Sequence, residues 1–457
     1  MQIKRILMIW LLLSFPVTIA SADSGATNSS TMTLDQAVSY ALAHSPDLQA
    51  AQSEITRREG IAATARSGLL PQVDVFGDMN HTYYDHAFPP ATSPQTIRFD
   101  DMIYTAGAEL KFMIWDFGQT ANELTAARDR VQAAQSLRNR RQQEVIYTTA
   151  ALYLKALTYE DLIDAATSTQ KSLQSLLQQT KELVDAGRAV PADVLKVSTR
   201  LAEIESDLAT LEAGRRTTVS QLAAAIGWEG ALPRLQYEPP GSGISETSEN
   251  ADTLISKAFA QRPDLRSQEN EIRAAIHQET AARSSRWPRA ELRAGAYEYA
   301  AADPVSSLGN SGPKPDSAVG DWAVGLHISM PLFDAGRRSG QIQTAIAQTE
   351  IARTAERKLR LDIAKEVRSA LADLESARKR VQATRESVAQ AKEVLRNERL
   401  KYAAGRSVIN FVLDAEATLL THQSLLRQAQ RSLRITQLVL DLNVGNIDPA
   451  AVASDAP

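Results

Sequence analysis

The segment from Arg337 to Ala404 reads RRSGQIQTAIAQTEIARTAERKLRLDIAKEVRSALADLESARKRVQATRESVAQAKEVLRNERLKYAA, which is 68 residues without a proline and with Gly340 as its only glycine. Apolar residues and one tyrosine recur in it at every seventh position: Val367, Leu374, Val381, Val388, Leu395 and Tyr402. A sustained heptad pattern is typical of helices packed as coiled coils and not of a globular core. At a rise of about 1.5 Å per residue, the segment predicts a helical rod roughly 100 Å long.

A second rod is predicted at 119–186, which also spans 68 residues and contains neither proline nor glycine. Its heptad positions lie 218 residues earlier and are less apolar: Thr149, Ala156, Ile163, Gln170, Leu177 and Val184. Shorter helices are predicted after the long ones and at the start of each half, at 192–226, 410–442, about 47–67 and about 264–286. A short helix stacked end to end on a medium one nearly matches a long helix in length. This predicts rods of equal length, as in the wall of a tube.

The chain repeats itself at a nearly constant offset. The recurring landmarks are Ser45-Pro46-Asp47-Leu48 with Arg262-Pro263-Asp264-Leu265 at an offset of 217, and, at an offset of 218, Trp115-Asp116-Phe117-Gly118 with Phe333-Asp334-Ala335-Gly336 and Gly187-Arg188-Ala189-Val190 with Gly405-Arg406-Ser407-Val408. Landmarks that keep register over such a distance indicate one structural unit written twice. The predicted organisation is a signal peptide at 1–22, repeats at 23–229 and 251–445, a linker at 230–250 and a C-terminal tail at 446–457.

Four strands are predicted from period-two alternation, at about 71–84, 102–115, 289–299 and 320–331. One face of the strands is apolar, and the other carries charges that we expect only to keep a lumen wet: Asp74, Asp78, Glu109, Lys111, Glu291 and Arg293. Strands of this length cross a bilayer when tilted, since about 9–11 residues suffice. A soluble sandwich with one wet face is the alternative. Four strands are too few to close a barrel within one chain.

Aromatic residues gather at the ends of the predicted strands and look like the interfacial girdles of a membrane barrel: Tyr83, Tyr84, Phe99, Tyr104, Trp115, Trp287 and Phe333. The strands of each pair are joined by a predicted loop, at 85–101 and 300–320. These two loops hold six prolines: Pro89, Pro90, Pro94, Pro304, Pro313 and Pro315.

The first residues are typical of an export signal. Lys4 and Arg5 precede an apolar run from Ile6 to Ile19, and Ala20-Ser21-Ala22 has the small residues that signal peptidase accepts. The run is short for a membrane helix, and a retained membrane anchor is the alternative. The sequence has no cysteine, which excludes disulfides, cysteine zinc sites and a lipid-modified N-terminal cysteine. We therefore expect an exported protein that is not a lipoprotein.

No enzyme signature is present in the sequence. The six histidines are scattered, and no His-Glu-x-x-His, phosphate-binding glycine loop or Gly-x-Ser-x-Gly occurs. His81 and His86 flank the first predicted loop, where they either bind a metal loosely or are solvated loop side chains. The net charge of −4 is spread without a basic block, which argues against a nucleic-acid partner. We expect no catalytic residue, no cofactor and no resident metal.

From about Leu34 to Gly445 the chain resembles the TolC family of outer-membrane efflux and type I secretion channels. Three motifs carry the resemblance: Pro-Asp-Leu in both leading helices, the corner at 332–337, and Tyr402-Ala403-Ala404-Gly405 followed by Val412-Leu413-Asp414. The family implies a mixed α and β membrane protein, in which four strands per subunit contribute to a trimeric twelve-stranded barrel and the long helices form a coiled-coil barrel. It also implies partners: a periplasmic adaptor, an inner-membrane ABC, RND or MFS transporter, and outer-membrane lipid.

Gly187 and Gly405 each separate a long helix from its returning partner. Glycine is favoured there as a left-handed helix cap. By resemblance these turns, with Arg188 and Arg406, form the tunnel tip that the adaptor contacts.

The resemblance also places four residues at the periplasmic entrance. Asp414 matches an acidic ring position, and Phe411 stands where relatives often have a second acid, which suggests an apolar constriction beside one acidic layer. Tyr402 and Asp193 match a hydrogen-bonded pair that keeps the tip closed. The alternatives are a position in the heptad seam for Tyr402 and an early-helix acid favoured by the helix dipole for Asp193.

The function expected from these features is a passive exit duct of a tripartite efflux or type I secretion system, in the outer membrane and extending into the periplasm. The alternative is a periplasmic coiled-coil protein that structures or binds other proteins and has no pore. The two differ in a simple observation, because only the channel needs detergent to leave the outer membrane.

Overall fold

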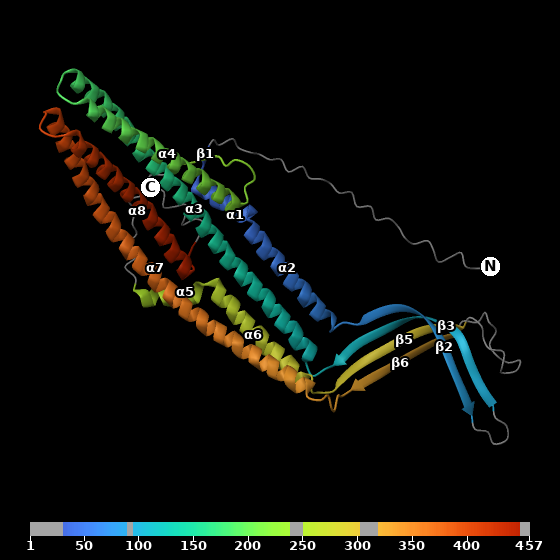
Figure 1. Ribbon diagram of the computed structural model, residues 1–457. Coiled ribbons are helices and arrows are strands. Elements are labelled where there is room, and N and C mark those ends of the chain that lie inside the picture. The colour runs from blue at the N-terminus through green and yellow to red at the C-terminus, as the bar shows by residue number, and fades with distance from the viewer. Residues whose placement is uncertain (1–30, 89–94, 238–249, 302–318, 448–457) are drawn as a thin grey trace.

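The computed structural model describes residues 31–88, 95–237, 250–301 and 319–447. The predicted signal peptide, most of the predicted linker and tail, and the six loop prolines lie outside these residues. The molecule is long and curved, with helices over most of its length and a sheet at one end (Figure 1).

Two long helices of 67 residues each form the backbone of the molecule, α3 (Gln119–Asp185) and α7 (Arg337–Ala403). Each turns back into a helix of 36 residues, α4 (Pro191–Ile226) after α3 and α8 (Ile409–Val444) after α7. Both turns lie at the end of the molecule opposite the sheet (Figure 1). The rods are continuous because nothing in the long segments interrupts backbone hydrogen bonding: proline is absent, and Gly340 lies in the first turn of α7.

Each half begins with two short helices, α1 (Leu34–His44) and α2 (Pro46–Ser67) in the first and α5 (Ala251–Gln261) and α6 (Pro263–Ser284) in the second. A proline at the first position of α2 and of α6 marks each junction, since it cannot continue the preceding helix. Helix α4 ends at Gly227 against the backbone of His44, and α8 ends at Gly445 against Arg262. The medium helices therefore abut the short ones at these junctions, alongside the long rods.

The sheet has four antiparallel strands in the order β2-β3-β5-β6. Their bounds are β2 (Gln72–Phe88), β3 (Gln95–Trp115), β5 (Arg289–Ala301) and β6 (Val319–Ser329). Strands β2 and β3 pair as far as Phe88 with Gln95, so they continue through most of the segment predicted as a loop, and His81 and His86 lie within β2. The polar residues of that segment do not interrupt the ladder, because it is made by backbone groups.

A second, two-stranded sheet was not predicted. It joins β1 (Thr31–Met32) to β4 (Arg234–Leu235), and β4 falls in the segment predicted as linker. The hydroxyl of buried Tyr153 on α3 lies 3.1 Å from the Met32 carbonyl and 2.8 Å from the Gln236 carbonyl. A side chain on the rod thus fixes both short strands.

The apolar residues form three clusters along the rods and no single core. One lies where α1 meets α3 and the end of α8, one joins α5, α7 and α8, and the third joins all four long helices near their turns. Among the described residues, no helix is both long enough and apolar enough to cross a membrane.

Corners of matching geometry join the sheet to α3 and α7. The backbone is left-handed at Phe117 (φ 56°) and Gly118 (φ 79°), and again at Ala335 (φ 52°) and Gly336 (φ 88°). An aspartate stabilises each corner: Asp116 accepts the backbone N–H of Thr120 at 2.7 Å, as Asp334 does from Arg338 at 3.3 Å.

Candidate functional site

The turns from α3 to α4 and from α7 to α8 have the same backbone structure. Gly187 and Gly405 are left-handed, with φ of 70° and 69°. After each glycine the arginine N–H donates back into the helix, Arg188 to Leu183 at 2.7 Å and Arg406 to Lys401 at 2.8 Å. This is a Schellman cap, in which a glycine satisfies the last carbonyls of a helix. A Cβ at either glycine would meet no atom within 4 Å, so both turns are open to solvent.

The two turns contact each other. Nη2 of Arg188 donates to the carbonyl of Ala403, the last residue of α7, at 3.3 Å. A cation at a helix C-terminus is favoured by the helix dipole. Glu398 stiffens the second turn, since it accepts from Lys401 at 2.6 Å and from the Ser407 hydroxyl at 3.0 Å. These hydrogen bonds from Lys401 and Ser407 lower the pKa of the Glu398 carboxyl.

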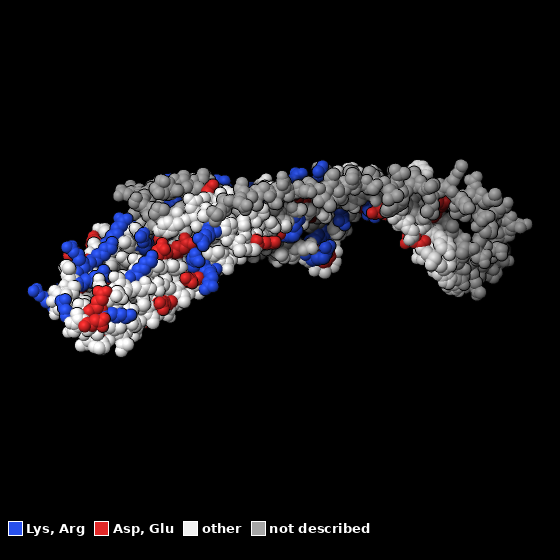
Figure 2. All heavy atoms as spheres, turned by 90° about the horizontal axis from the view of Figure 1, so that it is seen from above, with Lys and Arg blue, Asp and Glu red and all other residues white. Residues whose placement is uncertain are grey.

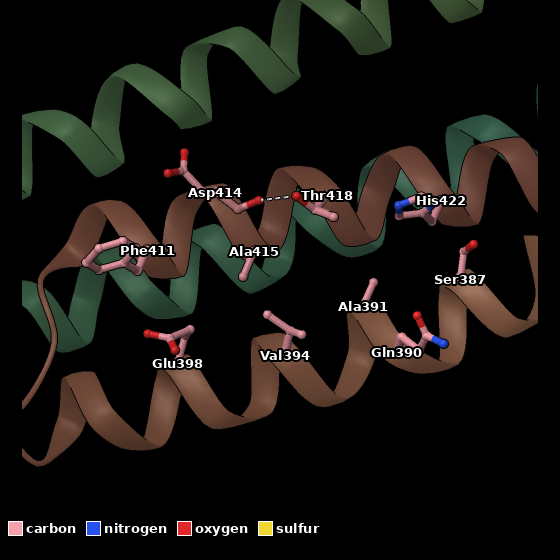
Figure 3. A pocket seen from close by; sticks show the side chains of 10 residues that line it. All are labelled: Ser387, Gln390, Ala391, Val394, Glu398, Phe411, Asp414, Ala415, Thr418 and His422. Atoms are coloured by element: carbon pink, nitrogen blue, oxygen red, sulfur yellow. Dashed lines mark hydrogen bonds between the residues drawn. The ribbon is translucent and has the colours of Figure 1, made fainter.

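Phe411 and Asp414 lie one turn apart on α8, and both are exposed in the single chain. They border a groove of about 440 Å³ between α7 and α8, which Val394 and Glu398 line from the α7 side. Figure 3 shows the Asp414 carboxylate directed away from α7. The sequence-predicted entrance residues on α8 are therefore accessible, and a second subunit or a partner can contact them.

Tyr402 and Asp193 are not hydrogen-bonded to each other within the described chain. Asp193, in the first turn of α4, is 3.6 Å from Lys196. Tyr402 packs against the apolar cluster near the turns, and its hydroxyl is buried without a hydrogen-bond partner among the described residues. Each residue therefore has the local setting that the sequence offered as an alternative.

A buried charge on α8 was not predicted. Glu416 accepts from the Ser172 hydroxyl on α3 at 2.8 Å and forms an ion pair with Arg399 on α7. The glutamate side chain is only 4% exposed, so a carboxylate replaces an apolar residue inside the helix packing. Its position follows Ile409 and Val412 at helical spacing, and this was the signal in the sequence. The cluster ties α3 to the α7–α8 hairpin.

The sheet presents two different faces. On one face large apolar side chains are exposed, including Val75 at 83% and Trp322 at 81%. On the other face charged residues pair with each other, as Lys111 does with Glu109 at 2.9 Å and Arg293 does with Glu291 at 2.8 Å. Figure 2 shows charged side chains of both signs mainly over the helices. No group of three or more metal-ligating side chains occurs among the described residues.

The chain matches the family model described as outer membrane efflux protein, over residues 37–228 and 254–446. It is 23% identical to the outer membrane efflux protein BepC of Brucella suis over 89% of this chain and 84% of that protein. It is 22% identical to the outer membrane protein TolC of Salmonella enteritidis, over 98% and 87% of the two chains.

The fold is similar to that of the solved outer membrane protein VceC from Vibrio cholerae. The TM-score is 0.73 at 20% sequence identity, over 90% of this chain and 96% of that one. The two matched segments of the family model together cover most of the sequence. The chain therefore belongs to the outer membrane efflux protein family, and its fold is that of the TolC-like channels.

Proposed function

We propose that three copies of this chain form the passive exit duct of an efflux or secretion system, through which an inner-membrane transporter delivers substrate across the periplasm and the outer membrane. The observation that carries this proposal is the exposed apolar face of an open sheet at the end of long rods. Val75 and Trp322, at 83% and 81% exposed, are on a surface that water does not favour and lipid does.

Closure of the sheet supports three copies. Strands β2 and β6 are at the two edges of the four-stranded sheet, and each has one side without a partner strand in the described chain. Three such sheets joined edge to edge give twelve strands, an even number that can close, and closure removes the exposed edges. The polar face then lines the lumen, and the apolar face contacts outer-membrane lipid.

The hairpin turns are the proposed docking surface for a periplasmic adaptor. Gly187, Arg188, Gly405 and Arg406 lie together at the far end of the molecule, where a partner in the periplasm would approach. The inner-membrane transporter is of the ABC, RND or MFS type, and energy comes from it. The duct itself has no catalytic residue in this proposal.

The entrance is proposed to be a ring of three Asp414 carboxylates beside three Phe411 side chains. Three-fold symmetry brings a pore-lining residue of each subunit to one level. Tyr402 and Asp193 are proposed to make their hydrogen bonds to each other only in the assembled, closed state, which gives the buried Tyr402 hydroxyl a partner.

Membrane fractionation followed by unheated gel electrophoresis tests the proposal. We expect a detergent-extracted band at the mass of a trimer, which heating converts to a monomer. Mass spectrometry of the same sample should give a mature chain that begins near Asp23 and carries no lipid. A product released from the periplasm by buffer alone would instead support a coiled-coil protein without a pore.

A further inference from the structure

Two aromatic side chains lie on the charged face of the sheet. Phe76 on β2 is paired in register with Gly107 on β3, Gly107 with Tyr297 on β5, and Tyr297 with Asp321 on β6. Residues paired across strands project from the same face of a sheet. This face also carries Glu109 and is the one opposite Val75 and Trp322, so it is the proposed lumen face. We call Phe76, Gly107, Tyr297 and Asp321 the aromatic row.

Glycines let the two rings lie low on the sheet. A Cβ at Gly107 would come within 2.7 Å of the Ala296 carbonyl, 3.0 Å of the Tyr297 ring and 3.2 Å of the Phe76 ring. The Tyr297 ring also covers Gly295, where a Cβ would overlap it. The centroids of the Phe76 and Tyr297 rings are 5.8 Å apart and the rings are tilted by 54°. The rings therefore meet above Gly107, in the middle of a water-facing surface.

Carboxylates flank the two rings. Asp321 is directly opposite Tyr297, and Asp78 is two residues beyond Phe76 on the same face. The nearby cations are already neutralised, Lys111 by Glu109 at 2.9 Å and Arg293 by Glu291 at 2.8 Å. In the described part of the chain, neither Asp78 nor Asp321 has an ion-pair partner. The surroundings of the rings thus favour a positive charge.

We propose that the aromatic row is a binding site for organic cations that carry a flat aromatic ring. A ring of the ligand packs on Phe76 and Tyr297, and its positive charge is attracted both by their π faces and by Asp321 and Asp78. Aromatic anions are repelled by the same carboxylates. The proposal rests on the proposed function, because this face borders a transport path only in a closed barrel. A trimer then has three such sites at one level of the lumen wall.

Ethidium is a suitable probe, because it is a flat aromatic cation whose fluorescence anisotropy rises on binding. The detergent-solubilised trimer is titrated with ethidium at low ionic strength. Tyr297→Leu and Phe76→Leu keep an apolar side chain but remove the ring, and each should weaken binding by about 2- to 30-fold, the range that cation–π energies give. Phe112→Leu is the matched control, since Phe112 projects from the opposite face of β3, and it should leave the affinity unchanged.

The charge contribution is tested separately. Asp321→Asn should weaken ethidium binding and make it less sensitive to salt. Tetraethylammonium, an aliphatic cation, and naphthalene sulfonate, an aromatic anion, should compete poorly. Equal ethidium affinities for the original protein, Tyr297→Leu and Phe76→Leu would overturn the inference.

A planar-bilayer recording of the same preparations separates this inference from the proposed function. Channels that conduct but show no ring-dependent ethidium binding would remove only the binding site. A preparation that forms no channel would remove the duct, and the site with it.

Discussion

Asp161 on α3 accepts a 2.9 Å hydrogen bond from Nε of Arg431 on α8, and the two side chains are 1% and 4% exposed. The Tyr237 hydroxyl donates to the same carboxylate at 2.6 Å, and the Arg431 guanidinium lies 5.7 Å from the centre of the Tyr237 ring. The pair links a helix of the first repeat to a helix of the second, away from the turns. Its charges are removed from water, so each depends on the other.

We expect Asp161→Ala to lower the free energy of unfolding by about 3–5 kcal/mol, because it leaves a buried guanidinium without its carboxylate. Asp161→Leu combined with Arg431→Met removes both charges and should cost much less. Denaturant unfolding in one detergent, followed by circular dichroism, measures both variants. Equal losses in the single and double variants would show that the ion pair is not what the helices depend on.

Gly405→Leu should leave the trimer intact but abolish export, because the change alters the proposed docking surface and not the barrel. The left-handed backbone makes the substitution locally unfavourable by about 1–2 kcal/mol, while no neighbouring atom obstructs the side chain. Gly230→Leu is the matched control, since Gly230 also has a positive φ (95°) and open space around it but lies outside the hairpin turns. The measurements are trimer content on unheated gels and export of substrate. Loss of the trimer in Gly405→Leu alone would mean that the glycine acts only as a helix cap.

Asp414→Asn should weaken the cation preference of the channel and its block by cations. Three carboxylates at one level attract cations and disfavour anions, and the amide removes that charge. The companion variant Phe411→Ala should raise the resting conductance, because it removes an apolar side chain from a narrow entrance. Single-channel recording in planar bilayers measures selectivity, block and conductance. Unchanged selectivity and block in Asp414→Asn would place the residue away from the pore.

Leu110→Arg should cost about 2–4 kcal/mol of barrel stability if residue 110 lies near the bilayer midplane, because it puts a charge on the lipid face. Lys111→Ala, one position on, should be nearly silent, since Lys111 is part of a solvated ion pair with Glu109. Urea unfolding from lipid vesicles measures both. Effects of the same size would indicate that the faces of β3 are assigned one residue out of register.

Acid should weaken the junction of α5 and α6. Burial opposes ionisation of Asp264, but the hydrogen bonds and charge of Arg262 outweigh it, so the pKa of this carboxyl is below its ordinary value. A carboxyl whose folded pKa is lowered stabilises the fold above its unfolded pKa of about 3.9, and this contribution is lost as the pH falls through the folded value.

We therefore expect Asp264→Asn to lower the melting temperature at pH 7 and to reduce the further loss on acidification to pH 3. Asp252→Asn is the control, because Asp252 is a largely exposed partner of Arg368 and should change neither value appreciably. Melting of the trimer at the two pH values, followed by circular dichroism, provides the measurement. An Asp264→Asn protein with the original acid sensitivity would contradict this assignment.

The rods could be predicted from the sequence because their signals are local. Absence of proline and a heptad pattern act within each segment, and α3 ends at Asp185, close to the predicted boundary. The full length of β2 and β3 could not be predicted, since their outer pairing depends on the neighbouring strand and not on alternation. The β1–β4 pair depends likewise on Tyr153, which is distant in sequence from both strands.

The turn glycines could be found because a left-handed cap needs a particular residue at a particular place. Alternation assigns a residue to a face, but it does not reveal which residue of another strand lies beside it. The meeting of Phe76 and Tyr297 therefore required the strand register. The burial of Glu416 likewise required knowing that Ser172 and Arg399 converge on it.

The matching corners and turns of the two halves have a consequence for the ancestry of the chain. An ancestral gene that encoded one half would supply one hairpin and two strands, so six separate chains would have to meet to close a barrel of twelve strands. Duplication halves that number and fixes half of the strand neighbours covalently. The halves have since become non-interchangeable: Arg262 binds Asp264 and Glu366 in the second, whereas Ser45 occupies its place in the first, with a buried hydroxyl that has no partner among the described residues. Six-fold symmetry has thereby been reduced to three-fold, and each hairpin of a subunit is free to acquire its own surface.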